Sequence, residues 1–141
     1  MGIPFAEPPI KELRFLAPKE IAPWQSVLFT KKEKPACFQF NINIKKSGSF
    51  GEYGQEDCLY LDIYTPAPDT NKRATVAFLY NEYFKNSYNK SIDYAPDFFI
   101  EEDVIVVTIS HRLNALGFLS LEDEILPGNA GLKDIVAGLQ W

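Results

Sequence analysis

One run of apolar and β-branched residues, at positions 104–109, contains no charged or amide side chain. A strand with one solvated face would alternate apolar and polar residues, so this run needs cover on both faces. Its short length, its β-branched residues and the acidic residues 101–103 before it favour a strand over a buried helix. The pattern therefore predicts a central strand of a parallel sheet, with flanking parts of the chain packed on its two faces.

Three other segments have strand-like patterns. Residues 58–64 and 75–80 form short apolar runs, and we expect the second to lie beside residues 104–109 in the same sheet. Residues 38–44 alternate apolar and polar side chains, which predicts a strand with one solvated face. The serine and glycine residues within 47–51 then predict a mobile loop.

Two segments are expected to be helical. Residues 132–141 carry apolar side chains at helical spacing: Leu132, Ile135, Val136 and Leu139. This pattern predicts a helix with one apolar stripe. A shorter helix should begin near Pro96, since proline fits the first helical turn. Residues 111–119, in contrast, are expected only to turn the chain.

The N-terminal segment is rich in proline, since residues 2–24 hold five of the ten prolines in the chain. Proline removes backbone hydrogen-bond donors too often here for a helix or an inner strand. The apolar residues of the segment, such as Phe5 and Trp24, cannot be buried against one another in an extended coil. We therefore expect a coil that wraps the surface of a larger folded body.

Composition and charge limit the possible partners. The chain has 141 residues, 46% of them hydrophobic, which is enough for one globular domain. Its net charge of -5 argues against binding to nucleic acid or to an anionic membrane surface. No apolar run is long enough to span a membrane, and no signal peptide is visible after Met1. The acidic residues 122–124 are expected to be solvated, so the sequence predicts no metal site and no cofactor.

The two cysteines, Cys37 and Cys58, have no nearby histidine or further cysteine and are therefore poor zinc ligands. A disulfide between them would stabilise the fold by roughly 3 kcal/mol and would form in an oxidising compartment. The alternative is a pair of buried free thiols.

Four stretches, in order along the chain, resemble the type-B carboxylesterase and cholinesterase family of α/β-hydrolases. They are the proline-rich opening at 2–15, the cysteine signature at 56–66, and residues 103–121 and 127–141. The resemblance implies an α/β fold that is the N-terminal portion of an α/β-hydrolase, with a mixed sheet, a proline-rich coil that wraps it and a C-terminal helix. Residues 1–141 would then be the incomplete N-terminal part of a single domain.

The resemblance also implies contacts. In the family, the cysteine of the signature pairs with an upstream cysteine, which corresponds to a Cys37–Cys58 disulfide here. The family has two ion pairs beneath its active-site region, and they fall on the following residues: Arg14 with Glu56, and Arg112 with Asp134. The alternative for these four side chains is solvent exposure, where a pair contributes at most about 1 kcal/mol.

The inferred disulfide and the resemblance together imply a protein that is secreted or on the extracellular side of the membrane. In such a protein Asn89, which begins the sequence Asn-Lys-Ser, is a candidate for glycosylation. An active member of the family would take a small-molecule ester as its substrate.

The catalytic residues of the family have no counterpart in this sequence. The serine of a Gly-x-Ser-x-Gly motif, the acid and the histidine would all lie beyond Trp141. His111 is the only histidine, and it stands where the family has tyrosine, so we expect it to be packed and not to act as a general base. Asn114 stands where the family usually has glycine, and asparagine tolerates the positive φ that glycine provides.

One catalytic feature of the family does fall within the chain, but with different residues. The family has a glycine-rich turn whose backbone N–H groups form most of the oxyanion hole, and Asn81, Glu82 and Tyr83 occupy its glycine positions here. Loss of one donor from such a hole costs about 2.7–4 kcal/mol of transition-state stabilisation. The carboxylate of Glu82 would oppose the oxyanion by roughly 4 kcal/mol more. We therefore expect a poor or inactive esterase; the alternative is a shifted alignment or a wrongly joined gene model.

Two further interpretations compete with ester hydrolysis. The first is a non-catalytic, cholinesterase-like binding or adhesion protein with a protein partner, which the altered turn favours. The second is an isolated piece without a stable fold, because its edge strands would be left open. A Gly-x-Ser-x-Gly motif beyond Trp141 would support hydrolysis, and its absence would favour binding.

Overall fold

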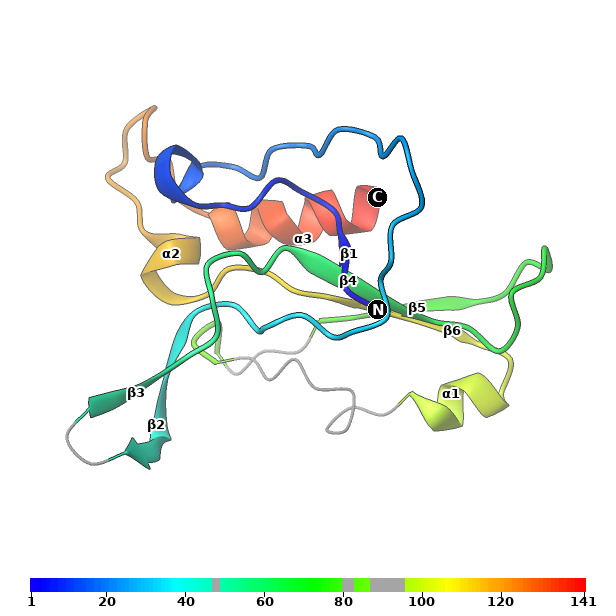
Figure 1. Cartoon of the computed structure of the whole chain (residues 1–141). Helices are drawn as coiled ribbons and strands as arrows, with labels where there is room; N and C mark the ends of the chain where they lie inside the picture. The colour runs from blue at the N-terminus through cyan, green and yellow to red at the C-terminus, as the bar shows by residue number, and fades with distance from the viewer. Residues whose placement is uncertain (47–48, 80–82, 87–95) are drawn as a thin grey trace.

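The computed structural model describes residues 1–46, 49–79, 83–86 and 96–141. A four-stranded sheet with the order β1-β4-β6-β5 forms its centre (Figure 1). The strands are β1 (Ile3–Pro4), β4 (Tyr60–Tyr64), β5 (Thr75–Phe78) and β6 (Ile105–Ile109). β6 runs antiparallel to β4 and parallel to β5, so the sheet is mixed, as the resemblance implies.

β6 is an inner strand, as the apolar pattern predicts, but the prediction of a parallel sheet is only half right. Leu61 of β4 is paired antiparallel with Ile109, whereas Ala77 of β5 is paired in parallel with Val107. The apolar pattern indicates that β6 is covered, and it carries no information about the direction of the neighbouring strands. The expected placement of residues 75–80 beside this strand is confirmed for β5, Thr75–Phe78, and position 80 lies outside the described residues.

Three α-helices and one 3-10 helix accompany the sheet in the described part of the chain. They are η1 (Lys11–Leu13), α1 (Asp97–Glu101), α2 (Asn114–Phe118) and α3 (Ala130–Gln140). α1 begins directly after Pro96, and α3 covers most of the predicted helix at 132–141, so both helices are confirmed. The prediction that residues 111–119 only turn the chain is wrong, because the short helix α2 lies there. Five residues are too few for a helical repeat of apolar positions to be visible.

α3 packs on the sheet through small residues and not through its predicted apolar stripe. The helix lies along one face of the sheet in Figure 1. An ideal Cβ at Gly138 would lie 2.5 Å from Cγ2 of Ile109, so glycine is what allows this close approach. The stripe residues Leu132, Val136 and Leu139 are 44%, 52% and 58% exposed. The pattern thus predicts the helix correctly, but the close approach of Gly138 to the Ile109 side chain places the face with small residues against the sheet.

A separate hairpin of β2 (Gln39–Lys46) and β3 (Ser49–Tyr53) projects from the main sheet (Figure 1). The predicted strand at 38–44 is confirmed by β2. The prediction of a loop within 47–51 is wrong for Ser49 and Gly51, which lie in β3, and positions 47–48 are outside the described residues. The register shifts between Asn41 and Lys46. Serine and glycine are compatible with an irregular hairpin of this kind.

The core forms around β4 and β6, where Leu61 and Ile109 are fully buried. Phe5 of the N-terminal segment joins this core, whereas Trp24 of the same segment is exposed. Between β1 and β2, η1 is the only helix or strand among the described residues. The helices of the described ranges are too short or too polar to cross a bilayer.

We expect Gly138→Ala to destabilise the fold by about 1–3 kcal/mol, because the new methyl group would meet Ile109 where there is no space for it. Gln140→Ala, at an exposed position of the same helix, is the control and should change the free energy of unfolding by less than about 0.5 kcal/mol. Urea unfolding of the two variants measures both values. Equal losses would contradict the close packing of α3 on β6.

Candidate functional site

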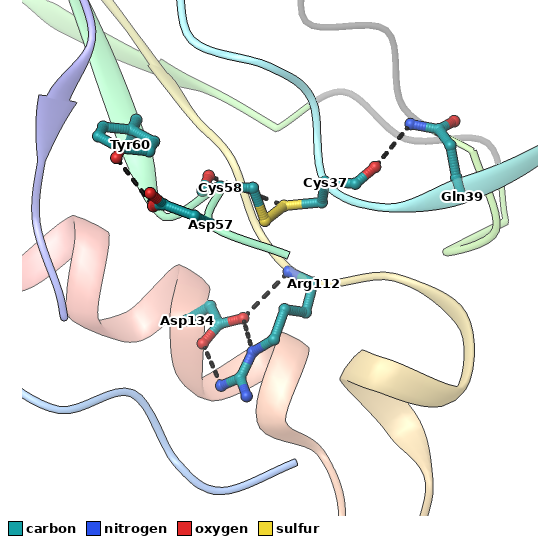
Figure 2. The surroundings of a disulfide bond; sticks show 7 residues. All are labelled: Cys37, Gln39, Asp57, Cys58, Tyr60, Arg112 and Asp134. Carbon is teal, nitrogen blue, oxygen red and sulfur yellow. Dashed lines mark hydrogen bonds and ion pairs between the residues drawn. A yellow bond between two sulfur atoms is a disulfide. The ribbon is translucent and has the colours of Figure 1, made fainter. Parts of the chain in front are cut away.

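Cys37 and Cys58 form a disulfide, which excludes the alternative of two free thiols. Their Cα atoms are 4.9 Å apart, within the ordinary range for a disulfide, and both residues are buried (Figure 2). Backbone hydrogen bonds reinforce the link, because Phe38 N donates to Gln55 O at 2.9 Å and Gln55 N donates to Ala36 O at 2.9 Å. The chain before β2 is thereby joined to the chain before β4.

Arg112 and Asp134 form a buried ion pair between the end of β6 and α3 (Figure 2). Arg112 Nη2 donates to Asp134 Oδ1 at 2.7 Å, and Arg112 Nε donates to Asp134 Oδ2 at 2.8 Å. The backbone N of Arg112 donates to the same Oδ2 at 3.0 Å. A guanidinium group that binds both carboxylate oxygens fixes direction as well as distance. The pair therefore sets where α3 lies relative to β6.

Two glycines allow the backbone to close around this ion pair. An ideal Cβ at Gly131 would lie 2.5 Å from the carbonyl oxygen of Arg112, and one at Gly117 would lie 2.3 Å from it. Gly117 belongs to α2 and Gly131 to α3, so both helices contact the same carbonyl. Arg112 is thus the meeting point of β6, α2 and α3.

The second implied pair, Arg14 with Glu56, is present but lies at the surface. Arg14 Nη2 donates to Glu56 Oε1 at 2.8 Å, and Arg14 Nε donates to Glu56 Oε2. The two side chains are 41% and 29% exposed. Water screens the attraction at such a position, so this pair orients the segment after η1 more than it stabilises it.

A third ion pair was not singled out by the sequence analysis. Arg73 Nε donates to Asp103 Oδ1 at 2.6 Å, and Arg73 Nη2 donates to Asp69 Oδ2 at 2.9 Å. The hydrogen bonds from Arg73 and from Asn71 lower the pKa of Asp69 to about 2. The opposite charges at positions 69 and 73, four residues apart, could have predicted the Asp69–Arg73 pair from the sequence. The contact with Asp103 depends on chain folding and left no signal in the sequence.

The turn that follows β5 is partly described. Asn81 and Glu82, two of the three residues at the glycine positions of the family, lie outside the described residues. Tyr83 is described, with a φ of 53° and a side chain that is 90% exposed. Phe84 follows with a φ of 57°. Both residues are in the left-handed region that glycine adopts without penalty, so the aligned position keeps a glycine-like backbone while it carries a tyrosine side chain.

The turn lies at the edge of the sheet where the two parallel strands end. β5 and β6 are parallel, so their carboxyl ends meet at one edge, which is where ligands bind in open α/β sheets. The ring of Phe84 contacts the ring of Phe118 in α2, with ring centres 5.2 Å apart. Since α2 follows β6, this contact places residues 83–86 beside the connection that leaves the same edge.

His111 is buried, and neither of its ring nitrogens has a hydrogen-bond partner in the described ranges. Burial lowers the pKa of His111, while the nearby Ile109 backbone and the Asp134 carboxylate act in the opposite direction. Among the described residues, no side chain is hydrogen-bonded to the ring that would orient it or that it could activate. This arrangement fits a packed residue and not a general base.

The remaining candidates form no cluster. Asn89 lies outside the described residues. The acidic residues 122–124 are exposed, and Asp123 Oδ1 accepts a hydrogen bond from Leu126 N at 2.6 Å. The described part of the chain contains no group of three or more side chains that could hold a metal ion. Asn114 has a φ of 52°, so the prediction that asparagine adopts a positive φ there is confirmed.

We expect Asp134→Asn to lower the free energy of unfolding by about 3–5 kcal/mol, because it leaves the buried Arg112 charge without a counter-charge. Glu56→Gln is the matched control, since it removes the charge from the exposed pair and should cause a clearly smaller loss. Urea unfolding at pH 7 measures both variants. A loss from Glu56→Gln as large as that from Asp134→Asn would contradict the assignment of Arg112–Asp134 as the stronger link.

Acidification should destabilise the protein through His111. Its pKa is lowered in the folded state, so as the pH falls below about 6.5 the unfolded state binds the proton first and stability decreases. His111→Phe removes this contribution, and its unfolding midpoint should fall less between pH 7 and pH 5 than that of the unaltered protein. Above pH 7 the two should respond to pH alike. Parallel curves over the whole range would show that His111 does not titrate in this way.

The comparisons with known proteins agree with this geometry. A sequence model described as "Carboxylesterase family" matches residues 1–141. The chain is 40% identical to a juvenile hormone esterase of Tribolium castaneum, over 99% of this chain and 24% of that protein. It is 37% identical to esterase FE4 of Myzus persicae and 38% identical to an acetylcholinesterase of Bungarus fasciatus, in each case over 100% of this chain and 25% of the relative. The chain thus spans about a quarter of the length of these relatives, and it belongs to the carboxylesterase family.

Proposed function

We propose that residues 1–141 are the N-terminal part of a single carboxylesterase-type α/β-hydrolase domain, whose family reaction is serine-dependent hydrolysis of a small-molecule ester. Two observations support this proposal: the family match along the whole chain, and the mixed sheet whose parallel strands end beside a turn. The nucleophile, the acid and the histidine would come from residues beyond Trp141. The proline-rich N-terminal segment would wrap the completed domain.

We also propose that the esterase activity is strongly reduced relative to active members of the family. The reason is the turn after β5. Tyr83 has a glycine-like φ of 53° although its side chain is that of tyrosine. A non-glycine residue in this region costs roughly 1–3 kcal/mol, and its Cβ limits how closely a substrate carbonyl can approach the backbone. Asn81 and Glu82, by their chemistry, add bulk and a negative charge where the reaction develops an oxyanion. Each effect acts against the transition state.

A second function is favoured by the same position. The Tyr83 side chain is 90% exposed at the edge of the sheet, where it is available to another molecule. Aromatic side chains of this kind are enriched in protein interfaces. A non-catalytic cholinesterase-like protein that binds a protein partner is therefore the alternative. The presence or absence of a Gly-x-Ser-x-Gly motif beyond Trp141 separates the two proposals.

We also propose that the protein is secreted or faces the extracellular side. The disulfide supports this location, because such bonds persist in oxidising compartments. Glycosylation of Asn89 would follow from that location and would require an accessible sequon.

Turnover of a short-chain aryl ester by the complete natural protein tests the proposed loss of activity. We expect kcat/KM to lie at least about 100-fold below that of an active carboxylesterase, since loss of a single oxyanion donor has about that effect. Replacement of Asn81, Glu82 and Tyr83 by glycine should raise the rate. Family-typical rates in the unaltered protein would contradict the proposal. No gain from the glycine replacement would show that the turn is not the cause.

A further inference from the structure

Asn114 of α2 binds the described part of the turn after β5, residues 83–86, through two hydrogen bonds. The backbone N of Asn114 donates to the carbonyl oxygen of Phe84 at 3.0 Å. Its side-chain Nδ2 donates to the carbonyl oxygen of Lys85 at 2.9 Å. Asn114 therefore binds two consecutive carbonyl groups of a segment that is 29 positions away in the sequence.

The turn needs such a contact because its backbone is strained. Tyr83 and Phe84 have φ values of 53° and 57°, two consecutive non-glycine residues in the left-handed region. A conformation of this kind persists only where surrounding contacts fix it. Tyr83 is almost fully exposed and provides little restraint, while the ring of Phe84 contacts the ring of Phe118 in an edge-type arrangement. The hydrogen bonds from Asn114 are polar contacts that act on the backbone itself.

Asparagine meets both requirements of position 114. The residue has a φ of 52°, which asparagine tolerates better than most other non-glycine residues. Its side-chain amide is a neutral donor, which an acceptor carbonyl requires. Glycine would accept the backbone conformation but has no side chain to reach Lys85. Aspartate would have the shape of asparagine but, once ionised, could not donate.

We propose that Asn114 is a positioning residue that holds residues 83–86, the described part of the glycine-free turn after β5, in one conformation at the edge of the sheet. The relevance of this to ester chemistry rests on the proposed function, in which the turn borders the reacting group. The positioning itself does not depend on catalysis. The side-chain amide of Asn114 helps to fix the backbone of this turn, because Tyr83 and Phe84 do not themselves favour a positive φ.

Trypsin cleavage after Lys85 reports directly on this contact, because the carbonyl that Asn114 binds belongs to the peptide bond that trypsin cuts. Lys85 is exposed, so its cleavage depends on how often the turn opens. In the complete natural protein, Asn114→Gly should increase the rate of this cut about fivefold, as expected from the loss of one ordinary hydrogen bond. Asn114→Asp should increase it at least as much, since a carboxylate would then face the Lys85 carbonyl.

Cleavage after Lys72 is the internal control. Lys72 is exposed and lies before β5, at the other end of that strand. A general loss of structure would increase both cuts and lower the melting temperature, whereas loss of positioning increases only the cut after Lys85. An unchanged rate after Lys85 in Asn114→Gly, or an equal rise after Lys72, would overturn the proposal. Because the assay contains no ester, its outcome is independent of whether the protein hydrolyses one.

Discussion

The buried ion pair between Arg112 and Asp134 is the interaction on which the arrangement of strand and helices depends. Two charges removed from water are favourable only when their geometry is close to ideal, and here three hydrogen bonds meet on one carboxylate. Gly117 and Gly131 lie against the carbonyl of the same arginine, so the side chain and the backbone of Arg112 act on different partners at once. These contacts fix the structure around Arg112 at the end of β6. The positions of α2 and α3 depend on them.

The N-terminal segment and the chain that follows it are attached to the rest of the structure by interactions other than a buried ion pair. The surface ion pair of Arg14 with Glu56 is screened by water, and further along the chain the Cys37–Cys58 disulfide joins the chain before β2 to the chain before β4. Gly2 N also donates to the carboxylate of Asp62, whose pKa is raised by burial. Phe5 contributes apolar contacts in the core. A segment that forms few regular hydrogen bonds is thus held by a small number of strong or cooperative contacts along its length.

The turn after β5 lies at the edge of the sheet that we propose as the place of ester chemistry, and its conformation depends on contacts with other parts of the chain. Tyr83 and Phe84 have backbone angles that suit glycine, although their side chains make those angles unfavourable. The conformation is therefore imposed from outside, by α2, whose own position depends on the contacts around Arg112. A substitution in the turn and the asparagine that supports it belong to one structural unit, although they are far apart in the sequence.

The sequence by itself determined the family, the presence of the inner strand, β5 beside it and the helices after Pro96 and near the C-terminus, because each depends on a local pattern or a motif. A Cys37–Cys58 disulfide was indicated by the two cysteines as well as by the resemblance, whereas the partners of Arg14 and Arg112 followed from the resemblance alone. The direction of β4 against β6 was decided by tertiary structure, since pairing between distant segments leaves no periodic trace. The helix α2 is too short to show a repeat of apolar positions, and the serine and glycine residues of β3 are typical of a loop. The tertiary structure also decided which face of α3 packs on the sheet. The close approach of the helix to Ile109 requires Gly138 at the contact, and so the apolar stripe faces elsewhere. The contact of Asn114 with Lys85 has the same origin: a hydrogen bond between distant residues exists only once the chain has folded.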